Sequence, residues 1–434
     1  MKNVLKIIIV WVLTLEAKAV LRKYKPNIVA VTGSVGKTTT KDAVYAALSK
    51  KFHVRKSQKS FNSEFGLPLT ILGAQNAWDN PLRWIQILID GVILLVMRAQ
   101  YPDWLVLEVG ADRPGDISGL SSWLKTDVVV ITYIPDVPVH VEFFDSPEAV
   151  AMEKASLVDT LKPGGTLILN GDDKHTAALA HRLPAPDAKL IYYGFGTKHD
   201  VHAEHPVLVK EEGGQGWPVG MRATLVVFDE SVEVEMVGAL GGHAFLPCIA
   251  AAAVAHTLGL GVADIAAGVE SYTPPPGRMR LIPGIKDTLL IDDTYNASPA
   301  ATTAGVETLG GIRPKRAIAV LGDMLELGRH SVEEHRKLGA VVAENADMLV
   351  TVGFRARGIV EGALDNGLKD SQILQYEDSR KAGEELKNMI QPGDVILVKG
   401  SQSMRMERVV EELMLEPERA SQLLVRQDAE WKRR

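Results

Sequence analysis

Residues 27–42, N-I-V-A-V-T-G-S-V-G-K-T-T-T-K-D, constrain the fold of this chain more than any other stretch. An apolar, β-branched run that contains Ile28 and Val29 ends at Gly33, and a basic, threonine-rich segment follows Gly36. Glycines let the backbone approach an anion closely, and the free N–H groups at a helix start point toward it. The pattern therefore predicts a strand, a phosphate-binding turn and a helix.

The side chains of this turn have expected roles. Lys37 is expected to reach the β- and γ-phosphates of ATP, and the Thr38 hydroxyl to bind Mg²⁺. The residues expected to contact ATP here are Gly33, Ser34, Val35, Gly36, Lys37, Thr38 and Thr39. The turn departs from the strict G-x-x-x-x-G-K-[ST] pattern, because Val31 stands where the first glycine should be. A glycine turn of another purpose is the alternative that this stretch alone leaves open.

The composition is that of a globular protein without a strong bias toward one class of partner. Apolar residues make up 46% of the 434 residues and charged residues 24%, and this length favours two or three domains. A net charge of −6 argues against a nucleic-acid binder, which would carry a basic surplus. Cys248 is the single cysteine, which excludes an internal disulfide and a cysteine-based zinc cluster and fits a reducing cytoplasm.

The order of apolar strands and helices predicts an α/β fold. Apolar strands expected at 104–109 and 128–132 alternate with helices, as in a parallel sheet, and residues 190–237 should form a small antiparallel layer on this core. Three prolines at 274–276 mark a hinge, beyond which strands are predicted at 287–292, 316–321, 348–353, 372–376 and 394–399. The expected organisation is an N-terminal helix (1–26), a P-loop-type ATP-binding domain with a mainly parallel sheet (27–273), a hinge (274–280) and a C-terminal Rossmann-like domain (281–434).

Two apolar segments, residues 4–15 and 82–98, raise the question of membrane contact. The first is shorter than the ~20 residues that a span needs, and Asp90 interrupts the second. No small-residue cleavage site precedes the basic residues at 18–25, which argues against a signal peptide. A helix packed on its own domain and a helix lying on the inner face of a membrane both fit the pattern.

Charged side chains outside the turn complete a candidate site. Glu108 ends an apolar strand, where ligands of parallel sheets sit, and is a candidate for Mg²⁺. His140 lies in a polar loop, and Lys154 lies in a predicted helix, where a solvated surface position is the default. Such a set suits ATP-driven phosphoryl transfer. A nucleotide switch or motor would instead want a Walker-B aspartate and no second substrate-sized domain.

Six motifs stand in a fixed order between residues 27 and 415. They are T-G-S-V-G-K-T (32–38), L-E-V-G-A-D-R-P-G-D-I (107–117), G-R-M-R (277–280), I-D-D-T-Y-N-A-S-P (291–299), L-G-D-M-L-E-L-G (321–328) and V-K-G-S (398–401). Together they resemble the Mur ligases, and among these the branch that joins D-alanyl-D-alanine to UDP-N-acetylmuramoyl-tripeptide. The family's shorter loop, T-G-[ST]-x-G-K-T, accounts for the missing first glycine.

The resemblance implies an ATP-dependent ligase that phosphorylates a muropeptide-type carboxylate, which the amine of an amino acid or dipeptide then attacks. It implies two Mg²⁺ ions, the first held by Thr38 and Glu108 and the second by His140. Lys154 would be carbamylated and join the metal site. Lys37, Arg278, Asp292 and Asn296 would contact ATP, with Lys37, His140, Lys154 and Arg278 catalytic. Asn62, Tyr295, Lys399 and Ser401 would contact substrates.

The chain departs from the family pattern in two places. Only 26 residues precede the core, where the family usually has a domain that binds the UDP end of the substrate. A UDP-binding or membrane partner, or a lipid-linked or shortened acceptor, is therefore expected. Second, G-G-H-A-F-L-P-C-I-A-A (241–251) keeps His243, but Ala244 and Pro247 replace both asparagines of the family's G-x-H-N-x-x-N-A-L-A-A. This replacement predicts a different or weaker grip on the adenine.

Three competing interpretations remain to be weighed. A folylpolyglutamate-synthetase-like glutamate ligase also lacks a UDP domain, but its branch is not expected to carry the motifs at 291–299 and 321–328. The Mur-like subunit of the lipid II amidotransferase needs a four-cysteine zinc ribbon, which one cysteine cannot form. A catalytically idle binding or scaffolding protein would explain the lost asparagines, but it would need neither Lys37 nor Glu108.

Overall fold

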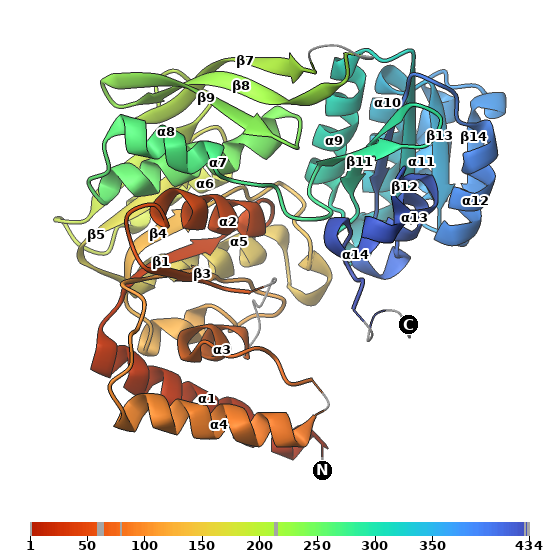
Figure 1. Cartoon of the computed structure of the whole chain (residues 1–434). Helices are drawn as coiled ribbons and strands as arrows, with labels where there is room; N and C mark the ends of the chain where they lie inside the picture. The colour runs from red at the N-terminus through yellow and green to blue at the C-terminus, as the bar shows by residue number, and fades with distance from the viewer. Residues whose placement is uncertain (1, 59–64, 79, 212–215, 429–430, 432–434) are drawn as a thin grey trace.

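The computed structural model describes residues 2–58, 65–78, 80–211, 216–428 and 431. Two sheets organise these residues: nine strands in the order β2-β3-β1-β4-β5-β6-β7-β8-β9, and six in the order β10-β11-β15-β12-β13-β14. Figure 1 shows the second sheet and its helices, in teal and blue, beside the red-to-green part of the chain that holds the first. The predicted α/β fold is confirmed.

The nine-stranded sheet is parallel from β2 to β7 and antiparallel at the β7–β9 edge. Its strands are β1 (Asn27–Thr32), β2 (Val54–Lys56), β3 (Trp104–Glu108), β4 (Thr126–Ile131), β5 (Leu161–Asn170), β6 (Lys189–Gly194), β7 (Val201–Lys210), β8 (Pro218–Val227) and β9 (Glu230–Val237). The antiparallel arrangement expected within residues 190–237 is confirmed for β7, β8 and β9, but these strands do not form a layer of their own. Strand β6 pairs with β5, and β7 pairs with β6 in turn, so these strands extend the central sheet.

Helices cover both faces of this sheet, as the alternation of residues in β1 requires. Val29 and Val31 share a core with α2 (Lys37–Leu48), α7 (Gly242–Thr257) and α8 (Val262–Glu270). Ile28 and Ala30, on the opposite face, share a core with α1 (Lys2–Tyr24) and α3 (Gly66–Leu72). On this second face the chain also forms α4 (Pro81–Val96) and α5 (Pro147–Ala155), and short α6 (Lys174–Ala177) follows β5.

The six-stranded sheet has the same three-layer construction. Its strands are β10 (Arg280–Gly284), β11 (Thr288–Asp293), β12 (Arg316–Gly322), β13 (Met348–Val352), β14 (Ile373–Tyr376) and β15 (Asp394–Lys399). One face is covered by α9 (Pro299–Ile312), α10 (Ser331–Asn345) and α11 (Arg357–Asp365), and the other by α12 (Ser379–Met389), α13 (Glu407–Leu413) and α14 (Ala420–Leu423). The sequence did not indicate β10, an edge strand that pairs antiparallel with β11 and contains a proline.

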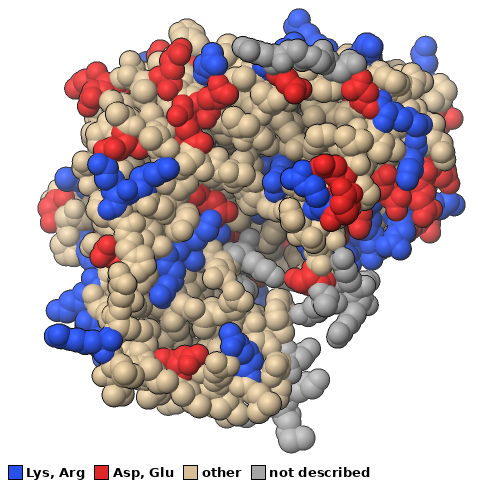
Figure 2. All heavy atoms as spheres, in the orientation of Figure 1, with Lys and Arg blue, Asp and Glu red and all other residues tan. Residues whose placement is uncertain are grey.

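The apolar N-terminal segment is longer and better packed than its sequence suggests. Leu13, Ala17 and Val20 on α1 are fully buried, so the expectation of packing on the chain's own domain holds for one face of this helix. Helix α4 lies beside α1 at the lower edge of the molecule in Figure 1. In the same view, Figure 2 shows that this edge is mostly uncharged. In the described part of the chain, no helix meets the length and apolarity required to span a membrane.

Candidate active site

The phosphate-binding turn is held against the end of β4. Gly33 has φ +142°, and a Cβ atom there would lie 2.0 Å from Oγ1 of Thr132, so only glycine fits. The backbone N–H of Ser34 donates to the carbonyl of Tyr133 at 2.8 Å. Gly36 has φ +87° and leads directly into α2, which starts at Lys37. The turn is therefore a preformed backbone cradle at the start of a helix, which is the geometry that binds phosphate.

The neighbouring strands β1 and β3 place Glu108 beside this turn. Val31 pairs in register with Glu108, so both strands end at the same edge of the sheet. The Thr38 hydroxyl donates to Oε1 of Glu108 at 3.0 Å, while Oε2 has no hydrogen-bond partner in the described structure. Lys37 Nζ donates to the carbonyl of Gly33 at 2.9 Å, and burial lowers the pKa of Lys37 although Glu108 opposes this.

These residues fit the groups that the sequence implies. A buried carboxylate oxygen that has no hydrogen bond and only the Lys41 ammonium 3.7 Å away, together with an adjacent hydroxyl, provides hard oxygen donors of the kind that Mg²⁺ prefers. The described residues contain no cluster of three or more His, Cys, Asp or Glu arranged as a metal cage. Mg²⁺ commonly binds through one or two carboxylates together with substrate phosphates and water, so a full protein cage is not required.

Arg278 brings the C-terminal sheet to the phosphate turn. Its guanidinium Nη2 lies 3.4 Å from Oγ1 of Thr38, and the group stacks 4.1 Å from the centre of the Tyr295 ring. Asp292, near the end of β11, holds the hinge in place, because its Oδ2 accepts from the backbone N–H of Gly277 at 2.9 Å. Burial raises the pKa of Asp292 to about 6. Arg278 therefore crosses from one domain to the other, while Asp292 supports it.

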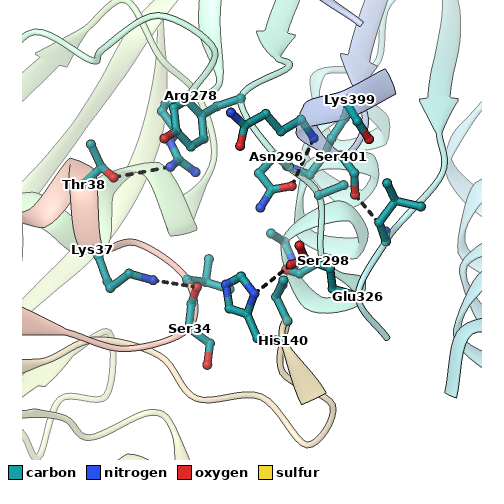
Figure 3. Close-up of a pocket in the computed structure, with 18 of the residues that line it drawn as sticks. Ser34, Lys37, Thr38, His140, Arg278, Asn296, Ser298, Glu326, Lys399 and Ser401 are labelled. Atoms are coloured by element: carbon teal, nitrogen blue, oxygen red, sulfur yellow. Dashed lines mark hydrogen bonds and ion pairs between the residues drawn. The ribbon is translucent and has the colours of Figure 1, made fainter. Parts of the chain in front are cut away.

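A second contact between the two halves joins His140 to Glu326. His140 Nδ1 lies 2.7 Å from Oε2 of Glu326, and its Nε2 lies 3.5 Å from Oδ1 of Asp112. The hydrogen bond from His140 lowers the pKa of Glu326. Figure 3 shows the imidazole pointing across the cavity toward the C-terminal half. The sequence marked the loop that carries Glu326 as a motif but gave no sign of this contact.

Lys399, at the end of β15, lies in the wall opposite the phosphate turn. Its Nζ lies 2.5 Å from Oδ2 of Asp293 and donates to the carbonyl of Asn296 at 3.0 Å. Burial lowers the pKa of Lys399, and Asp293 opposes this. Ser401 accepts a hydrogen bond from the backbone N–H of Leu325 at 2.8 Å. Its hydroxyl thereby ties the end of β15 to the loop that carries Glu326.

These groups surround one cavity of about 630 Å³ between the two halves. The expected site residues that line it are Ser34, Val35, Gly36, Lys37, Thr38, Glu108, His140, Arg278, Tyr295, Asn296, Lys399 and Ser401. Gly33, Thr39, Lys154 and Asp292 lie outside this lining, and Asn62 lies outside the described residues. Asp112, Arg405 and Trp431 also line the cavity and were not expected to, although Asp112 lies within the motif at 107–117 and could have been found from it.

Lys154 is buried at the last turn of α5, so the default of a solvated surface lysine is wrong. Its side chain is 1% exposed. Burial lowers its pKa to about 7, the charge of Lys37 acts in the same direction, and Asp112 opposes both. A substantial fraction of the side chain is therefore a neutral amine at neutral pH.

A smaller cavity of about 50 Å³ adjoins the phosphate turn on the side of α7. Its lining includes Thr39, His243, Ala244 and Tyr272. Burial lowers the pKa of His243 to about 4, and its Nε2 has no hydrogen-bond partner among the described residues. The retained histidine of this motif is thus a neutral imidazole, while Pro247, which replaces the second asparagine, is buried within α7.

Comparison with known proteins matches most of the chain. The Mur ligase middle domain matches residues 31–80 and 91–255, and the Mur ligase, glutamate ligase domain matches residues 277–402. UDP-N-acetylmuramoyl-tripeptide–D-alanyl-D-alanine ligase of Bacillus subtilis is 31% identical over 405 residues, which cover 92% of this chain and 79% of that protein. The chain belongs to the Mur ligase family.

Solved structures agree with this membership. MurF from Acinetobacter baumannii superposes with a TM-score of 0.75 at 26% identity, covering 92% of this chain and 79% of that one. MurF from Thermotoga maritima in complex with ADP superposes with a TM-score of 0.72 at 28% identity, covering 93% and 83%. As a Mur ligase, the protein is an ATP-dependent ligase, and its predicted membership is confirmed.

Proposed function

We propose that this Mur ligase joins D-alanyl-D-alanine, or a similar amino acid or dipeptide, to a muropeptide acceptor of peptidoglycan synthesis. The name of the B. subtilis relative supports the substrate pair. The observation that carries the proposal is the shared cavity, in which Lys37 and Glu108 of one domain face Arg278 and Lys399 of the other. This cavity gives a nucleotide and two substrates one place in which to meet, lined by residues of both domains.

The proposed reaction has two steps. An acceptor carboxylate oxygen attacks the γ-phosphorus of ATP, giving an acyl phosphate and releasing ADP. The donor amine then attacks the acyl carbon, and the resulting intermediate expels phosphate and loses a proton to form the amide. Lys37 and Arg278 would neutralise charge on the transferred phosphoryl group, since positioning and charge neutralisation dominate such transfers. Mg²⁺ held by Thr38 and Glu108 would supply further neutralisation.

Lys154 and His140 are proposed to hold a second Mg²⁺. The neutral amine of Lys154 can react with CO₂, releasing a proton and forming a carbamate whose oxygens are hard anionic ligands. The burial of this lysine supports the idea, because a protonated amine does not react. His140 contacts Glu326 through Nδ1 and Asp112 through Nε2, so an ion bound at Nε2 would leave the contact with Glu326 in place.

The roles of the residues near the substrates and the nucleotide are likewise proposed. Tyr295, Lys399 and Ser401 would border the donor amine or the acceptor, while Asn296 and Asp292 would act near the nucleotide. The enzyme is proposed to work in the cytoplasm at the inner face of the membrane, where a membrane or UDP-binding partner would present the acceptor. The exposed apolar faces of α1 and α4 support this location.

Release of ADP by the purified chain tests the function. The assay combines ATP, Mg²⁺ and UDP-N-acetylmuramoyl-tripeptide, with or without D-alanyl-D-alanine, and uses Lys37→Ala as the matched inactive control. The proposal predicts release that depends on both substrates. Stimulation by folate and glutamate instead would establish the folylpolyglutamate-type alternative. ADP release no greater than that of Lys37→Ala under every condition would favour the idle scaffold.

A further inference from the structure

The outer faces of α1 and α4 carry apolar side chains that the fold leaves uncovered. Those on α4 are Leu82, Ile85, Ile89, Val92, Ile93 and Val96. Those on α1 are Ile7, Ile8, Trp11 and Leu15. Their spacing of three and four residues places them on one stripe of each helix. The inner faces are also apolar, since Leu13 and Ile87 pack with Leu69 of α3 in a core of their own.

This face exposes more large apolar side chains than the rest of the described structure does. Twelve of the twenty-two exposed large apolar side chains in the described structure lie within residues 7–15 and 78–97. Val96 is 79% exposed, Leu82 75% and Trp11 63%. Isolated apolar side chains are normal on a monomer, whereas a contiguous patch of this extent marks an interaction surface.

Positive charge borders the apolar face. At the C-terminal end of α1 a groove of about 540 Å³ is lined by Lys18, Arg22, Lys25, Lys125 and Lys162. Lys162 is paired with Asp127 at 2.8 Å, but Arg22, Lys25 and Lys125 are exposed to solvent. Among the described side chains of α1 and α4, Asp90 is the only exposed carboxylate, because Glu16 is buried against Gly91 between the two helices.

We propose that the paired outer faces of α1 and α4 dock on the surface of a bilayer that contains anionic lipids. The apolar stripes would enter the boundary between headgroups and acyl chains, and the cations of the groove would contact lipid phosphates. The exposed Trp11 and Trp78 are side chains typical of that boundary. The proposal gives a physical basis to the proposed inner-face location and does not depend on the ligase chemistry.

A second copy of the chain fits this face less well than a bilayer does. The C-terminal ends of α1 and α4 lie together, as the hydrogen bonds from Lys23 Nζ to the carbonyls of Leu94 and Leu95 show. Arg22 therefore marks one end of the pair and Arg83 the other. Two such faces packed against each other would oppose basic ends in either orientation, and like charges across an interface are unfavourable.

Flotation with lipid vesicles tests the proposal on the full chain, without nucleotide or acceptor. Vesicles of phosphatidylcholine alone are compared with vesicles that also contain phosphatidylglycerol. The triple variant Trp11→Ser, Ile85→Ser, Ile89→Ser removes apolar contact, and Val332→Ser with Phe354→Ser is the matched control on the other domain, where both side chains are 75% exposed. We expect roughly tenfold or greater loss of binding for the triple variant and none for the control.

A second pair of substitutions tests the charged groove. Arg22→Gln with Lys125→Gln should lower binding to the anionic vesicles by roughly tenfold and leave weak binding to neutral vesicles unchanged. Absence of wild-type binding to anionic vesicles, or equal binding by the triple serine variant, would overturn the proposal. So would a concentration-dependent dimer, seen by light scattering, that the serine substitutions abolish.

Two controls separate docking from folding and from catalysis. ADP release with soluble substrates and the thermal unfolding midpoint of each variant should match those of the wild type. Should the triple variant unfold, Ile85→Glu alone replaces it in the flotation assay. It adds a negative charge at an exposed position of the apolar face and should likewise reduce binding to anionic vesicles. An inactive wild type that still floats with anionic vesicles would reject the proposed ligase substrates but keep the docking surface.

Discussion

Lys154 allows an experiment in which stability and activity should change in opposite directions. Burial lowers the pKa of this lysine to about 7, whereas the same side chain in the unfolded chain titrates near its ordinary value of about 10. Each pKa unit corresponds to about 1.4 kcal/mol, so at pH 7 the fold carries a penalty of at most about 4 kcal/mol for this amine. Replacement by methionine, which is apolar and of similar length, removes that penalty.

The variant Lys154→Met is therefore expected to unfold at a higher urea concentration than the wild type in buffer free of bicarbonate. The gain in stability over the wild type should be largest at pH 7 or below, where the amine of Lys154 is protonated in the unfolded chain but costly to protonate in the folded chain. It should fade as the pH rises from 7 toward 10, because the amine then becomes neutral in the unfolded chain as well. ADP release should fall by at least about 100-fold if the lysine, as a carbamate, holds a metal.

Lys41 is the matched control for this experiment. It is also a buried lysine, but its Nζ donates to the carbonyl of Ser57 at 3.0 Å and lies 3.3 Å from Oδ1 of Asp42. Lys41→Met should destabilise the fold by about 1–3 kcal/mol, because the carbonyl of Ser57 loses its donor and Oε2 of Glu108 loses a cation 3.7 Å away, while Asp42 keeps Lys56 at 2.7 Å. Wild-type ADP release by Lys154→Met would refute the metal role, and lower stability of that variant at pH 7 would refute the penalty.

Three further outcomes are expected. Burial raises the pKa of Glu16 to about 7, so the stability that its neutral carboxyl contributes is full below about pH 4.5 and is lost as the pH rises through 7. Glu16→Gln should therefore reduce the change of the thermal unfolding midpoint between pH 5 and 8, and an unchanged pH dependence would contradict this. Glu326→Ala should lower kcat roughly 10- to 100-fold by releasing His140 from the facing domain, and steady-state kinetics with an unaltered kcat would exclude that role. Lys399→Met should cost about 3–5 kcal/mol in urea unfolding, because Asp293 loses its buried cation. Adding Asp293→Leu should restore part of this stability and no activity, because the backbone N–H of Met279 then loses its acceptor.

The sequence predicted the half of the site that depends on local pattern. A strand that ends at Thr32, a glycine turn and a helix start fix the position of Lys37, and the strand-end rule placed Glu108 beside it. Ser298 caps the helix that starts at Pro299, because its hydroxyl accepts from the backbone N–H of Ala301, and a serine before a proline is a local signal for such a start. Each of these features involves residues that are close in sequence or strands whose ends share one edge.

The other half depends on how the two domains pack, which single-sequence patterns do not encode. The contact between His140 and Glu326 joins loops far apart in the chain, and neither the polar loop of His140 nor the motif at 321–328 indicates that the two side chains meet. Burial of Lys154 likewise follows from the packing of α5, while its sequence surroundings fit a surface helix equally well. The edge strand β10 was missed because its proline argues against a strand and only pairing with β11 offsets it.

Helix α1 ends at Tyr24 and β1 begins at Asn27, so only Lys25 and Pro26 separate them. The phosphate turn follows directly at the far end of β1, and the ATP-binding half of the cavity is thus rigidly mounted on the face that we propose to rest on lipid. The C-terminal half is joined through the three prolines at 274–276. On a membrane, the nucleotide would then keep a fixed distance from the bilayer and a fixed orientation, and opening of the cavity would move the C-terminal half relative to the bilayer.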